Sequence, residues 1–336
     1  MTRTALITGI TGQDGSYLAE LLVAKGYEVH GLVRRTSVHS TGRIDHLVQP
    51  NGDALSPVRL HVGDVSDPMG MHRLVRDIRP DEVYHLAAQS NVGASFIAPV
   101  PTATVTGLGT LHMLEASRSA EWPIRFYQAG SSEMFGAVRE TPQTESTPFA
   151  PRSPYAVAKV FAHHLTSQYR DAYGLFACNG LLFNHESPRR GEDFVTRKVT
   201  KAVAAIVAGR QRQLSLGNLA ARRDWGFAPE YVDAMWRMLQ QDQPDDYLIA
   251  TGETHSVEDL AREAFSVVGL DWRDYVVIDE SLRRPTEVEV LTGDARKAEA
   301  ALGWRPQTRF PALVRLMVAA DLRRVGVDPH RYPELA

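Results

Sequence analysis

The stretch ITGITGQDGSYLAELL, residues 7–22, places three glycines between an apolar run and an amphipathic segment. Gly9, Gly12 and Gly15 have the spacing G-x-x-G-x-x-G. Glycines between a strand and a helix let the backbone approach a pyrophosphate, which binds the free N–H groups at the helix N-terminus. A purely structural turn is the alternative, but the strand before and the helix after favour dinucleotide binding.

The alternation of apolar runs and amphipathic segments continues as far as residue 130. Nearly continuous apolar strands that alternate with helices indicate a parallel sheet covered on both faces. We therefore predict an α/β fold with a Rossmann-type, doubly wound parallel sheet. Strands are predicted at residues 4–9, 27–34, 58–64, 81–88 and 124–130, and helices at 16–26, 68–78 and 107–119.

A long helix is predicted after the fifth strand. Pro154 is favoured at the first position of a helix, and Gly174 is a typical residue for its end. The apolar run LFACNGLLF, residues 175–183, then indicates another buried strand. The regular alternation therefore extends to residue 183.

This alternation ends at Asn184, where the polar segment NHESPRRGEDFV begins. Further on, DDYLIATG, residues 245–252, has the composition of a strand that returns to the sheet. We therefore predict a dinucleotide-binding Rossmann domain over residues 1–183, with later returns near 225–250, and a smaller C-terminal substrate-binding lobe over 184–336, interleaved with it.

The composition is that of an ordinary folded protein, with 43% hydrophobic and 23% charged residues among 336. Because the formal net charge is only -3, no broad basic surface is available for nucleic acid or anionic lipid. We expect no nucleic acid or membrane partner and no metal site. An anionic ligand must then be bound by cations gathered in one pocket.

Cys178 is the single cysteine and lies in an apolar run, which predicts a buried thiol rather than a disulfide. No stretch approaches the roughly 18 apolar residues that a membrane-spanning helix needs. No signal-peptide pattern precedes the first strand. These features together predict a cytoplasmic protein.

Arg34 and Arg35 follow the second predicted strand, where an NAD-binding site would offer an acidic residue to the ribose. Because arginine can hold a phosphate in a bidentate fork, the pair favours NADP with its ribose 2′-phosphate. A solvated charge pair is the alternative. Asp64, after the third strand, could reach the adenine, and LAAQS, residues 86–90, could lie along the cofactor.

Tyr155 and Lys159 stand four residues apart in SPYAVAKV, which puts them on one face of the long helix. A neighbouring ammonium group is expected to lower the pKa of the phenol from about 10 towards the working range. Lys159 could also hold the ribose of the nicotinamide. Tyr155 could then accept a hydroxyl proton from a substrate while hydride leaves the same carbon.

The fifth strand ends in GSSEMFG, residues 130–136, which should face the same cleft as Tyr155. Ser131 would hydrogen-bond the reacting hydroxyl. A simple ketone reductase needs no acid there, so Glu133 implies a second proton transfer. Once C4 of a sugar is a ketone, its C5 hydrogen is acidic, and Glu133 could remove it. The C6 hydroxyl would leave as water, assisted by Ser132 or Glu133, and hydride would return to C6.

Several motifs together resemble those of the GDP-mannose 4,6-dehydratase family, in the extended short-chain dehydrogenase/reductase superfamily. NHESPRRG and RDWG are far more specific for it than the glycine turn. The resemblance covers nearly the whole chain and implies a lyase that converts GDP-D-mannose to GDP-4-dehydro-6-deoxy-D-mannose and water with tightly bound, recycled NADP. Other matching stretches are GLVRRTS, PDEVYHLAAQS, FYQAGSSEMFG, TPFAPRSPYAVAKV, GNLAARRDWGFAPEYVDAMW and RRPTEVEVLTGD.

The motifs and the resemblance together imply three sets of site residues. The catalytic set is Ser131, Ser132, Glu133, Tyr155 and Lys159. The cofactor-binding set is Gly9, Thr11, Gly12, Gln13, Asp14, Gly15, Arg34, Arg35, Asp64, Val65, Leu86, Ala88, Gln89, His185 and Arg190, with Tyr155 and Lys159. The set for the sugar nucleotide is Ser90, Asn184, Val195, Lys198, Leu216, Asn218, Arg223, Arg284 and Glu287, whose cations suit a diphosphate.

The chain departs from the family pattern beside the expected nicotinamide pocket. QSNVGASF stands where relatives have roughly QSHVKVSF, so a histidine and a basic residue are lost at Asn91 and Gly93. Pro101 stands where relatives have a tyrosine. The exact substrate therefore stays open, and a related dehydratase or epimerase of another, modified GDP-sugar is the alternative. A 4-epimerase needs no C5 base, so Glu133 separates these two reactions.

A non-catalytic NADP sensor is a third class of function, against which the intact Tyr155, Lys159 and Glu133 argue. Members of the family form dimers or tetramers, and the tetramers use a loop after the paired arginines. The corresponding loop is RTSVHSTGRIDHL, residues 35–47. The resemblance thus implies a homodimer or homotetramer in which Arg43 could reach the cofactor of a neighbouring chain.

Overall fold

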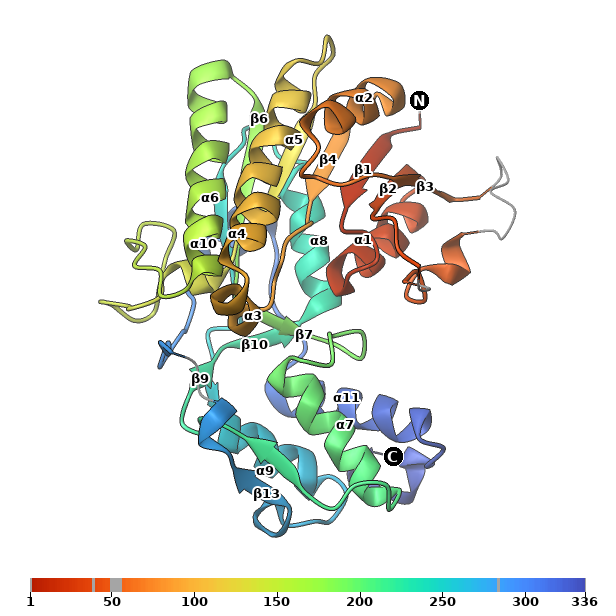
Figure 1. The fold of residues 1–336 in the computed structure, drawn as a ribbon, viewed down its shortest axis with the longest axis vertical. Helices are drawn as coiled ribbons and strands as arrows, with labels where there is room; N and C mark the ends of the chain where they lie inside the picture. The colour runs from red at the N-terminus through yellow and green to blue at the C-terminus, as the bar shows by residue number, and fades with distance from the viewer. Residues whose placement is uncertain (1, 38–39, 49–55, 283–284, 336) are drawn as a thin grey trace.

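A seven-stranded parallel sheet forms the centre of the computed structural model, which describes residues 2–37, 40–48, 56–282 and 285–335 (Figure 1). The strand order is β11-β6-β5-β4-β1-β2-β3. It reverses beside β1, as in a doubly wound Rossmann-type sheet, and the predicted fold class is confirmed. The strands are β1 Thr4–Thr8, β2 Glu28–Val33, β3 Val58–Val62, β4 Glu82–His85, β5 Arg125–Ala129, β6 Phe176–Leu182 and β11 Asp246–Ile249.

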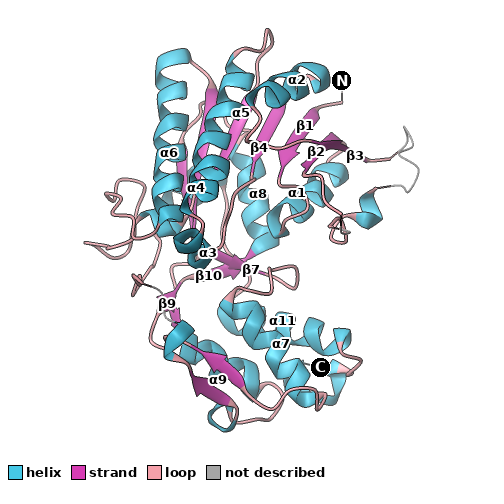
Figure 2. Cartoon of the chain, viewed as in Figure 1, coloured by secondary structure: helices cyan, strands magenta, loops and turns pink. Residues whose placement is uncertain are grey.

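Helices cover both faces of this sheet (Figure 2). Side chains alternate between the faces of a strand, so Ala5 and Ile7 join one apolar core and Leu6 joins the other. The first core is covered by α1 Gln13–Ala24, α8 Ala228–Met238 and α10 Arg296–Leu302. The second is covered by α2 Pro68–Ile78, α5 Gly109–Arg118 and α6 Pro154–Tyr173, with the short α3 Val92–Ile97 and α4 Pro99–Thr102 nearby.

The first helix begins earlier than the sequence predicts. Gly12 is the N-cap of α1, and Gln13 already belongs to the helix. Gly15 therefore lies in the first helical turn, where its missing Cβ lets the helix approach β1. The fourth strand ends at His85, so LAAQS leaves the sheet as a loop, three residues sooner than predicted.

The predicted long helix α6 has clear signals at both ends. The hydroxyl of Ser153 accepts a hydrogen bond from the backbone N–H of Ala156 at 3.1 Å, and Pro154 occupies the first turn. Gly174 ends the helix with φ of 69° in the left-handed region, which favours glycine. These ends fix the first turn of α6 beside the carboxyl ends of β5 and β6.

After β6, most of the chain forms a second lobe with its own apolar core. Residues such as Val199, Phe265 and Leu313 fill this core. The main helices and strands are α7 Val195–Val207, α9 Val257–Ser266, α11 Phe310–Arg324, β8 Leu214–Leu216 and β13 Val276–Ile278. Helix α9 starts with a capping box between Ser256 and Asp259.

The chain crosses between the two parts several times, because α8, β11 and α10 return to the sheet. Two short strand pairs mark the crossings, β7 Asn184–Glu186 with β10 Trp225–Phe227, and β9 Arg222–Arg223 with β12 His255–Ser256. Asp224, between β9 and β10, accepts hydrogen bonds from the backbone of Thr251 at 2.8 Å and Gly252 at 2.9 Å. Burial raises the pKa of Asp224 to about 6, and these bonds oppose the rise.

Cys178 is buried and free, which confirms the predicted thiol. Burial raises the pKa of this thiol to about 12, so it stays protonated at neutral pH.

Over the described residues, no helix combines the length and apolar character that crossing a membrane requires.

Candidate active site

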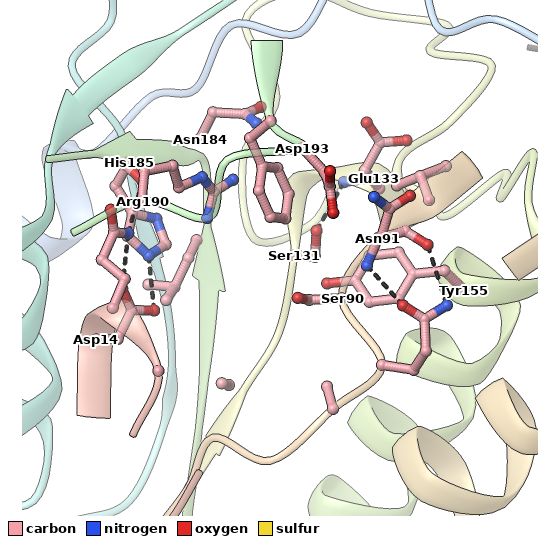
Figure 3. Close-up of a pocket in the computed structure, with 18 of the residues that line it drawn as sticks. Asp14, Ser90, Asn91, Ser131, Glu133, Tyr155, Asn184, His185, Arg190 and Asp193 are labelled. Carbon is pink, nitrogen blue, oxygen red and sulfur yellow. Dashed lines mark hydrogen bonds and ion pairs between the residues drawn. The ribbon is translucent and has the colours of Figure 1, made fainter. Parts of the chain in front are cut away.

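The carboxyl ends of the parallel strands open into a cavity of about 760 Å³. Its walls come from the glycine turn, the ends of β4 and β5, the start of α6 and the second lobe (Figure 3). Ligands of open α/β sheets bind at such a place, outside the strand ends where the strand order reverses. The position alone therefore marks a candidate active site.

Most of the predicted site residues line this cavity. They are the whole catalytic set, all of the cofactor-binding set except Arg35 and Asp64, and Ser90, Asn184, Val195, Lys198, Leu216, Asn218, Arg223 and Glu287 of the substrate set. Arg284 lies outside the described residues. The tertiary structure thus gathers residues that are up to about 280 positions apart along the chain.

The glycine turn is packed too closely for side chains. A Cβ on Gly15 would lie 2.3 Å from the carbonyl oxygen of Gly9, far inside van der Waals contact. Gly9 itself has φ of 74°, which only glycine adopts readily. Because the turn is this tight, the N-terminus of α1 reaches the cavity wall, where its free N–H groups could hold a pyrophosphate.

A buried polar cluster fastens the turn to β7. Asp14 Oδ2 lies 2.8 Å from Nε2 of His185, whose Nδ1 lies 2.7 Å from the carbonyl of Phe183. Gln13 donates to the carbonyl of His185 at 3.0 Å and accepts from the hydroxyl of Ser187 at 2.8 Å. Burial disfavours both charges of the pair, yet their attraction prevails, so the pKa of Asp14 is lowered and the pKa of His185 is raised.

The two arginines after β2 differ in position. Both are exposed, but only Arg34 lines the cavity. Asp64 accepts hydrogen bonds from the backbone and hydroxyl of Ser66 at 2.9 and 2.8 Å. Asp64 therefore shapes the turn before α2, and neither it nor Arg35 is among the described residues that form the cavity wall.

Tyr155 and Lys159 face the cavity from the first two turns of α6. The ammonium of Lys159 lies 5.9 Å from the centre of the phenol ring and donates to the carbonyl of Ala129 at 2.6 Å. Burial lowers the pKa of Lys159 to about 8. Burial also raises the pKa of Tyr155 to about 12, which a hydrogen bond with Ser131 opposes.

The predicted lowering of the phenol pKa is therefore wrong for this structure. Removal of Tyr155 from water disfavours its phenolate, and the nearby carboxylate of Glu133 disfavours it further. The sequence could place Lys159 one turn from the phenol but could not show how deeply both side chains are buried. Ionisation of Tyr155 thus needs additional positive charge in the cavity.

Glu133 follows β5 in a short helical turn, Ser132–Met134, and is 8% exposed. The hydroxyl of Ser131 caps this turn by accepting from the backbone N–H of Glu133 at 3.3 Å. One carboxylate oxygen of Glu133 lies 3.8 Å from the guanidinium of Arg223 in the second lobe. Figure 3 shows Ser131, Glu133 and Tyr155 at one end of the cavity, opposite Asp14 and His185 at the other.

Several cavity residues were not predicted from the sequence, and Glu186, Asp193 and Phe194 are three of them. Glu186 Oε2 lies 3.1 Å from Nε of Arg190, and the ring centre of Phe194 lies 3.7 Å from its guanidinium carbon. Both side chains hold the guanidinium of Arg190 in place. All three belong to the specific segment NHESPRRGEDFV, which was the only signal in the sequence that could have identified them.

Arg43 joins two segments of its own chain. It donates to the carbonyl of Thr11 at 3.1 Å and to the carbonyl of Arg189 at 2.9 Å. Arg189 in turn lies 2.5 Å from Glu20 on α1. Arg43 thus adds to the connection between the glycine turn and the segment after β7, and a contact with a neighbouring chain would require it to exchange these bonds.

The departures from the family pattern lie in the cavity wall. Asn91, Gly93 and Pro101 all line it. The amide of Gln89 donates to the carbonyl of Asn91 at 3.0 Å and accepts from its N–H at 2.7 Å. The side chain of Asn91 accepts from the N–H of Ala94 at 2.9 Å and so caps α3. Asn91 is therefore held in place by hydrogen bonds within the wall.

Comparison with known proteins gives consistent matches. The profile of a family described as GDP-mannose 4,6 dehydratase matches residues 6–317. GDP-mannose 4,6 dehydratase 2 of Arabidopsis thaliana is 56% identical over 325 residues, 95% of this chain and 87% of the relative. The Homo sapiens GDP-mannose 4,6 dehydratase is 48% identical over 346 residues, 97% of this chain and 93% of the relative.

Solved structures share the fold. A UDP-glucose 4-epimerase of Thermus thermophilus, in complex with NAD, is 27% identical with a TM-score of 0.81, over 95% of this chain and 98% of that one. The RMD protein of Pseudomonas aeruginosa, complexed with NADPH, is 24% identical with a TM-score of 0.78, over 96% and 100%. The second of these shows a likeness of fold alone.

The pair of Asp14 and His185 predicts a pH-dependent stability. Because the pKa of His185 is raised in the folded chain, its stabilising effect is complete below the ordinary value of 6.5 and is lost as the pH rises through the raised value. The loss of unfolding free energy in His185→Gln should therefore be largest below pH 6.5 and should shrink as the pH rises above that value. Urea unfolding measures it, with the exposed His330→Gln as control. An unchanged loss would contradict the ionic contribution.

Proposed function

The chain belongs to the GDP-mannose 4,6-dehydratase family and is a lyase that removes water from GDP-mannose, and we propose that Ser131, Glu133, Tyr155 and Lys159 carry out this reaction. The product is GDP-4-dehydro-6-deoxy-D-mannose. One observation supports this assignment above all. A phenol, a hydroxyl and a carboxylate from two distant segments meet at one end of a cavity whose other end holds the glycine turn (Figure 3).

Oxidation at C4 requires a base for the hydroxyl proton, and Tyr155 takes that role in the proposal. Ser131, which hydrogen-bonds the phenol, orients the same hydroxyl. When bound, a nicotinamide would supply the hydride acceptor for C4 and the hydride donor for C6. The positive charge of Arg190 opposes the burial that raises the pKa of Tyr155 to about 12, and an oxidised nicotinamide would add to this effect when bound.

Elimination of water then requires a base and an acid on neighbouring carbons. The C4 ketone makes the C5 hydrogen acidic, and Glu133 removes it. Glu133, helped by the buried hydroxyl of Ser132, delivers this proton to the C6 hydroxyl, which leaves as water. Arg223 borders the carboxylate of Glu133 and holds it between the two lobes.

The second lobe is proposed to hold the nucleotide of the substrate. Lys198 lies one turn from the start of α7, and both its ammonium and the positive end of this helix suit a diphosphate. Leu216, Asn218 and Glu287 line the same wall and suit a guanine base. Arg284 keeps its predicted role as part of this proposal, although it lies outside the described residues.

The chain uses a nicotinamide cofactor, and we propose NADP in particular. The fit of the glycine turn to a pyrophosphate supports the cofactor, and Arg34 at the cavity wall supports the 2′-phosphate. Arg35 is exposed beside it and can turn towards the same phosphate. A related dehydratase or epimerase of another, modified GDP-sugar is the second candidate, and the departures at Asn91, Gly93 and Pro101 favour testing it.

Replacement of Glu133 tests the proposed C5 base. In Glu133→Gln, oxidation at C4 should proceed and elimination should stop, because an amide cannot take the proton. We expect turnover to fall by about 100-fold or more, with reduced nicotinamide absorbance retained on the protein during incubation with GDP-mannose.

Mass spectrometry of the nucleotide sugar gives the second reading, because the product is lighter by one water. Glu140→Gln is a suitable control, since Glu140 lies outside the cavity in the same loop region. Normal water loss in Glu133→Gln would remove this residue as the base. A product of unchanged mass in the wild type would favour the epimerase.

Replacement of Arg34 tests the choice of NADP. Loss of a charged hydrogen bond to phosphate should weaken NADP binding by about 10- to 100-fold in Arg34→Ala, while NAD, which lacks this phosphate, should bind as before. Isothermal titration with both cofactors measures the two affinities. Arg35→Ala should have the smaller effect, and equal losses for NADP and NAD would show that the arginine acts on structure instead.

We further propose a cytoplasmic homo-oligomer, a dimer or tetramer. The exposed apolar residues Val157 and Phe161 on α6, with Leu108 beside them, support association of this helix with a second copy. Light scattering should then give at least twice the chain mass of 37.2 kDa. The mass of a single chain would refute the proposal.

A further inference from the structure

We propose that a row of polar side chains beneath α6, buried except at its outer end, binds internal water molecules and connects Lys159 with the edge of the sheet, so that the active site can exchange protons with solvent. We call Thr8, His85, Gln128, Asn179 and Asp246 the polar row. This inference rests on the proposed function for its chemistry, but its structural part can be tested separately.

The polar row crosses five strands at one level. Thr8 pairs with His85, His85 with Gln128, Gln128 with Asn179, and Asn179 with Asp246. Residues paired in this way point to the same face of a sheet. The row therefore runs from β1, near the centre of the sheet, to the edge strand β11.

The face that carries the row is the one under α6. Two residues before the row members stand Leu6, Val83, Phe126 and Ala177, which all belong to the apolar core on that face. The core is thus apolar at one level and polar at the next, towards the carboxyl ends of the strands. Such a layer of polar groups in a sheet interior needs partners.

Helix α6 presents a matching stripe. Tyr155, Lys159, His163 and Ser167 follow one another at intervals of four residues, which places them on one side of the helix. The amide nitrogen of Asn179 donates to the carbonyl of His163 at 3.3 Å and to the hydroxyl of Ser167 at 3.2 Å. The side of α6 that carries Tyr155 and Lys159 therefore also contacts the polar row, through His163 and Ser167.

Four polar atoms in this layer find no hydrogen-bond partner in the described part of the chain. They are Nε2 of His85, Oε1 of Gln128, Oδ1 of Asn179 and Nδ1 of His163. Their side chains are between 0% and 8% exposed. More than nine in ten buried polar groups in proteins are paired, and ordered water is the usual partner where protein groups are absent.

The hydrogen position on His85 follows from its neighbour. The hydroxyl oxygen of Thr8 accepts from the backbone N–H groups of Leu86 and Ala87 at 3.1 and 3.2 Å. Its own hydrogen is therefore donated to Nδ1 of His85 at 2.9 Å. A neutral ring that accepts at Nδ1 carries its hydrogen on Nε2, so the unpartnered atom of His85 is a donor.

A donor on His85 and an acceptor on Gln128 thus stand side by side on adjacent strands. Strands lie about 4.8 Å apart, and one water molecule between the two side chains can accept from His85 and donate to Gln128. Lys159 has N–H groups to spare beyond its bond to Ala129. The amide of Gln128 donates to the same carbonyl of Ala129 at 3.1 Å, so Lys159 lies beside the polar row. Burial lowers the pKa of His85 to about 3, and the charge of Lys159 lowers it as well.

The other end of the row reaches the edge of the sheet. Asn179 donates to Asp246 at 3.0 Å, and Asp246 also lies 2.7 Å from Nη1 of Arg170 and 3.7 Å from Nε2 of His163. The side chain of Asp246 is 17% exposed, so this end meets solvent. Water bound at Gln128, Asn179 and His163 would complete the connection to Lys159.

The proposed reaction needs such a connection. In one turnover, O4 and C5 each release one proton. The departing C6 hydroxyl takes up one proton, and C5 later takes up another. The net change in the substrate is therefore the loss of one water. Glu133 passes its proton to the C6 hydroxyl. The phenol of Tyr155 holds the O4 proton and must release it before the next turnover, while C5 takes a proton from solvent. The polar row gives Tyr155 the route for that release by way of Lys159.

A crystal structure of the wild-type protein tests the structural part without reference to the reaction. At a resolution that shows ordered water, we expect water within hydrogen-bond distance of His85 Nε2 and Gln128 Oε1. A dry layer around these atoms would overturn the proposal, even if the protein dehydrates GDP-mannose. Water in the layer of a protein that leaves GDP-mannose unchanged would contradict the proposed function and leave the hydrated row in place.

Gln128→Leu tests the role in proton release, because leucine is of similar size and cannot hold the bridging water. We expect kcat to fall by about tenfold or more, with a larger solvent deuterium isotope effect and an unchanged KM for GDP-mannose. A single turnover, in which the phenol need not be reset, should keep its wild-type rate. Gln128→Met gives a second apolar variant if the first folds poorly.

Tyr127→Phe is the matched control. Tyr127 is the preceding residue, points to the opposite face of β5 and also has a buried polar atom that the described residues leave without a partner. Removal of the Tyr127 hydroxyl should change neither kcat nor the isotope effect. Equal behaviour of Gln128→Leu and Tyr127→Phe, in rate and isotope effect, would refute the proton route.

Discussion

The ion pair between Asp14 and His185 is the constraint on which the site depends. The two residues are 171 positions apart, one on the glycine turn and one on β7, and Gln13 adds two hydrogen bonds to the same connection. Removing two charges from water is costly unless they meet in good geometry. Because His185 is buried and the side chain of Asp14 is only 22% exposed, neither segment can move away without leaving a largely buried charge unpaired. The cofactor side of the cavity is therefore preformed.

The same cost of burial shapes the chemistry at the other end of the cavity. Burial pushes the pKa of Lys159 down and the pKa of Tyr155 up, so both side chains favour their neutral forms more than they do in water. A positive ring bound beside them would oppose this preference of the phenol. The base would then become active mainly when the cofactor is bound and oxidised, which is the state in which the C4 hydroxyl must lose its proton.

The two lobes are joined where the reaction is proposed to occur. Glu133 of the first part meets Arg223 of the second, and Asp224, the next residue, binds the backbone at Thr251 and Gly252. The RDWG motif therefore contacts the carboxylate of Glu133 through Arg223 and fixes the crossing of the chain through Asp224. This arrangement would keep the proposed base, which follows β5, beside the nucleotide sugar that the second lobe is proposed to hold. The polar row leads away from the second lobe, from the active site into the part of the sheet beneath α6.

The sequence by itself determined the doubly wound sheet, the glycine turn and the pairing of Tyr155 with Lys159, because these depend on periodicity and spacing within short segments. The sequence could not determine how deeply each side chain is buried. Only the tertiary structure showed that burial raises the phenol pKa, that Asp64 turns towards Ser66, and that the polar row forms one continuous layer. Solvent exclusion and contacts between distant segments arise from packing of the whole chain, and no local pattern of residues encodes them.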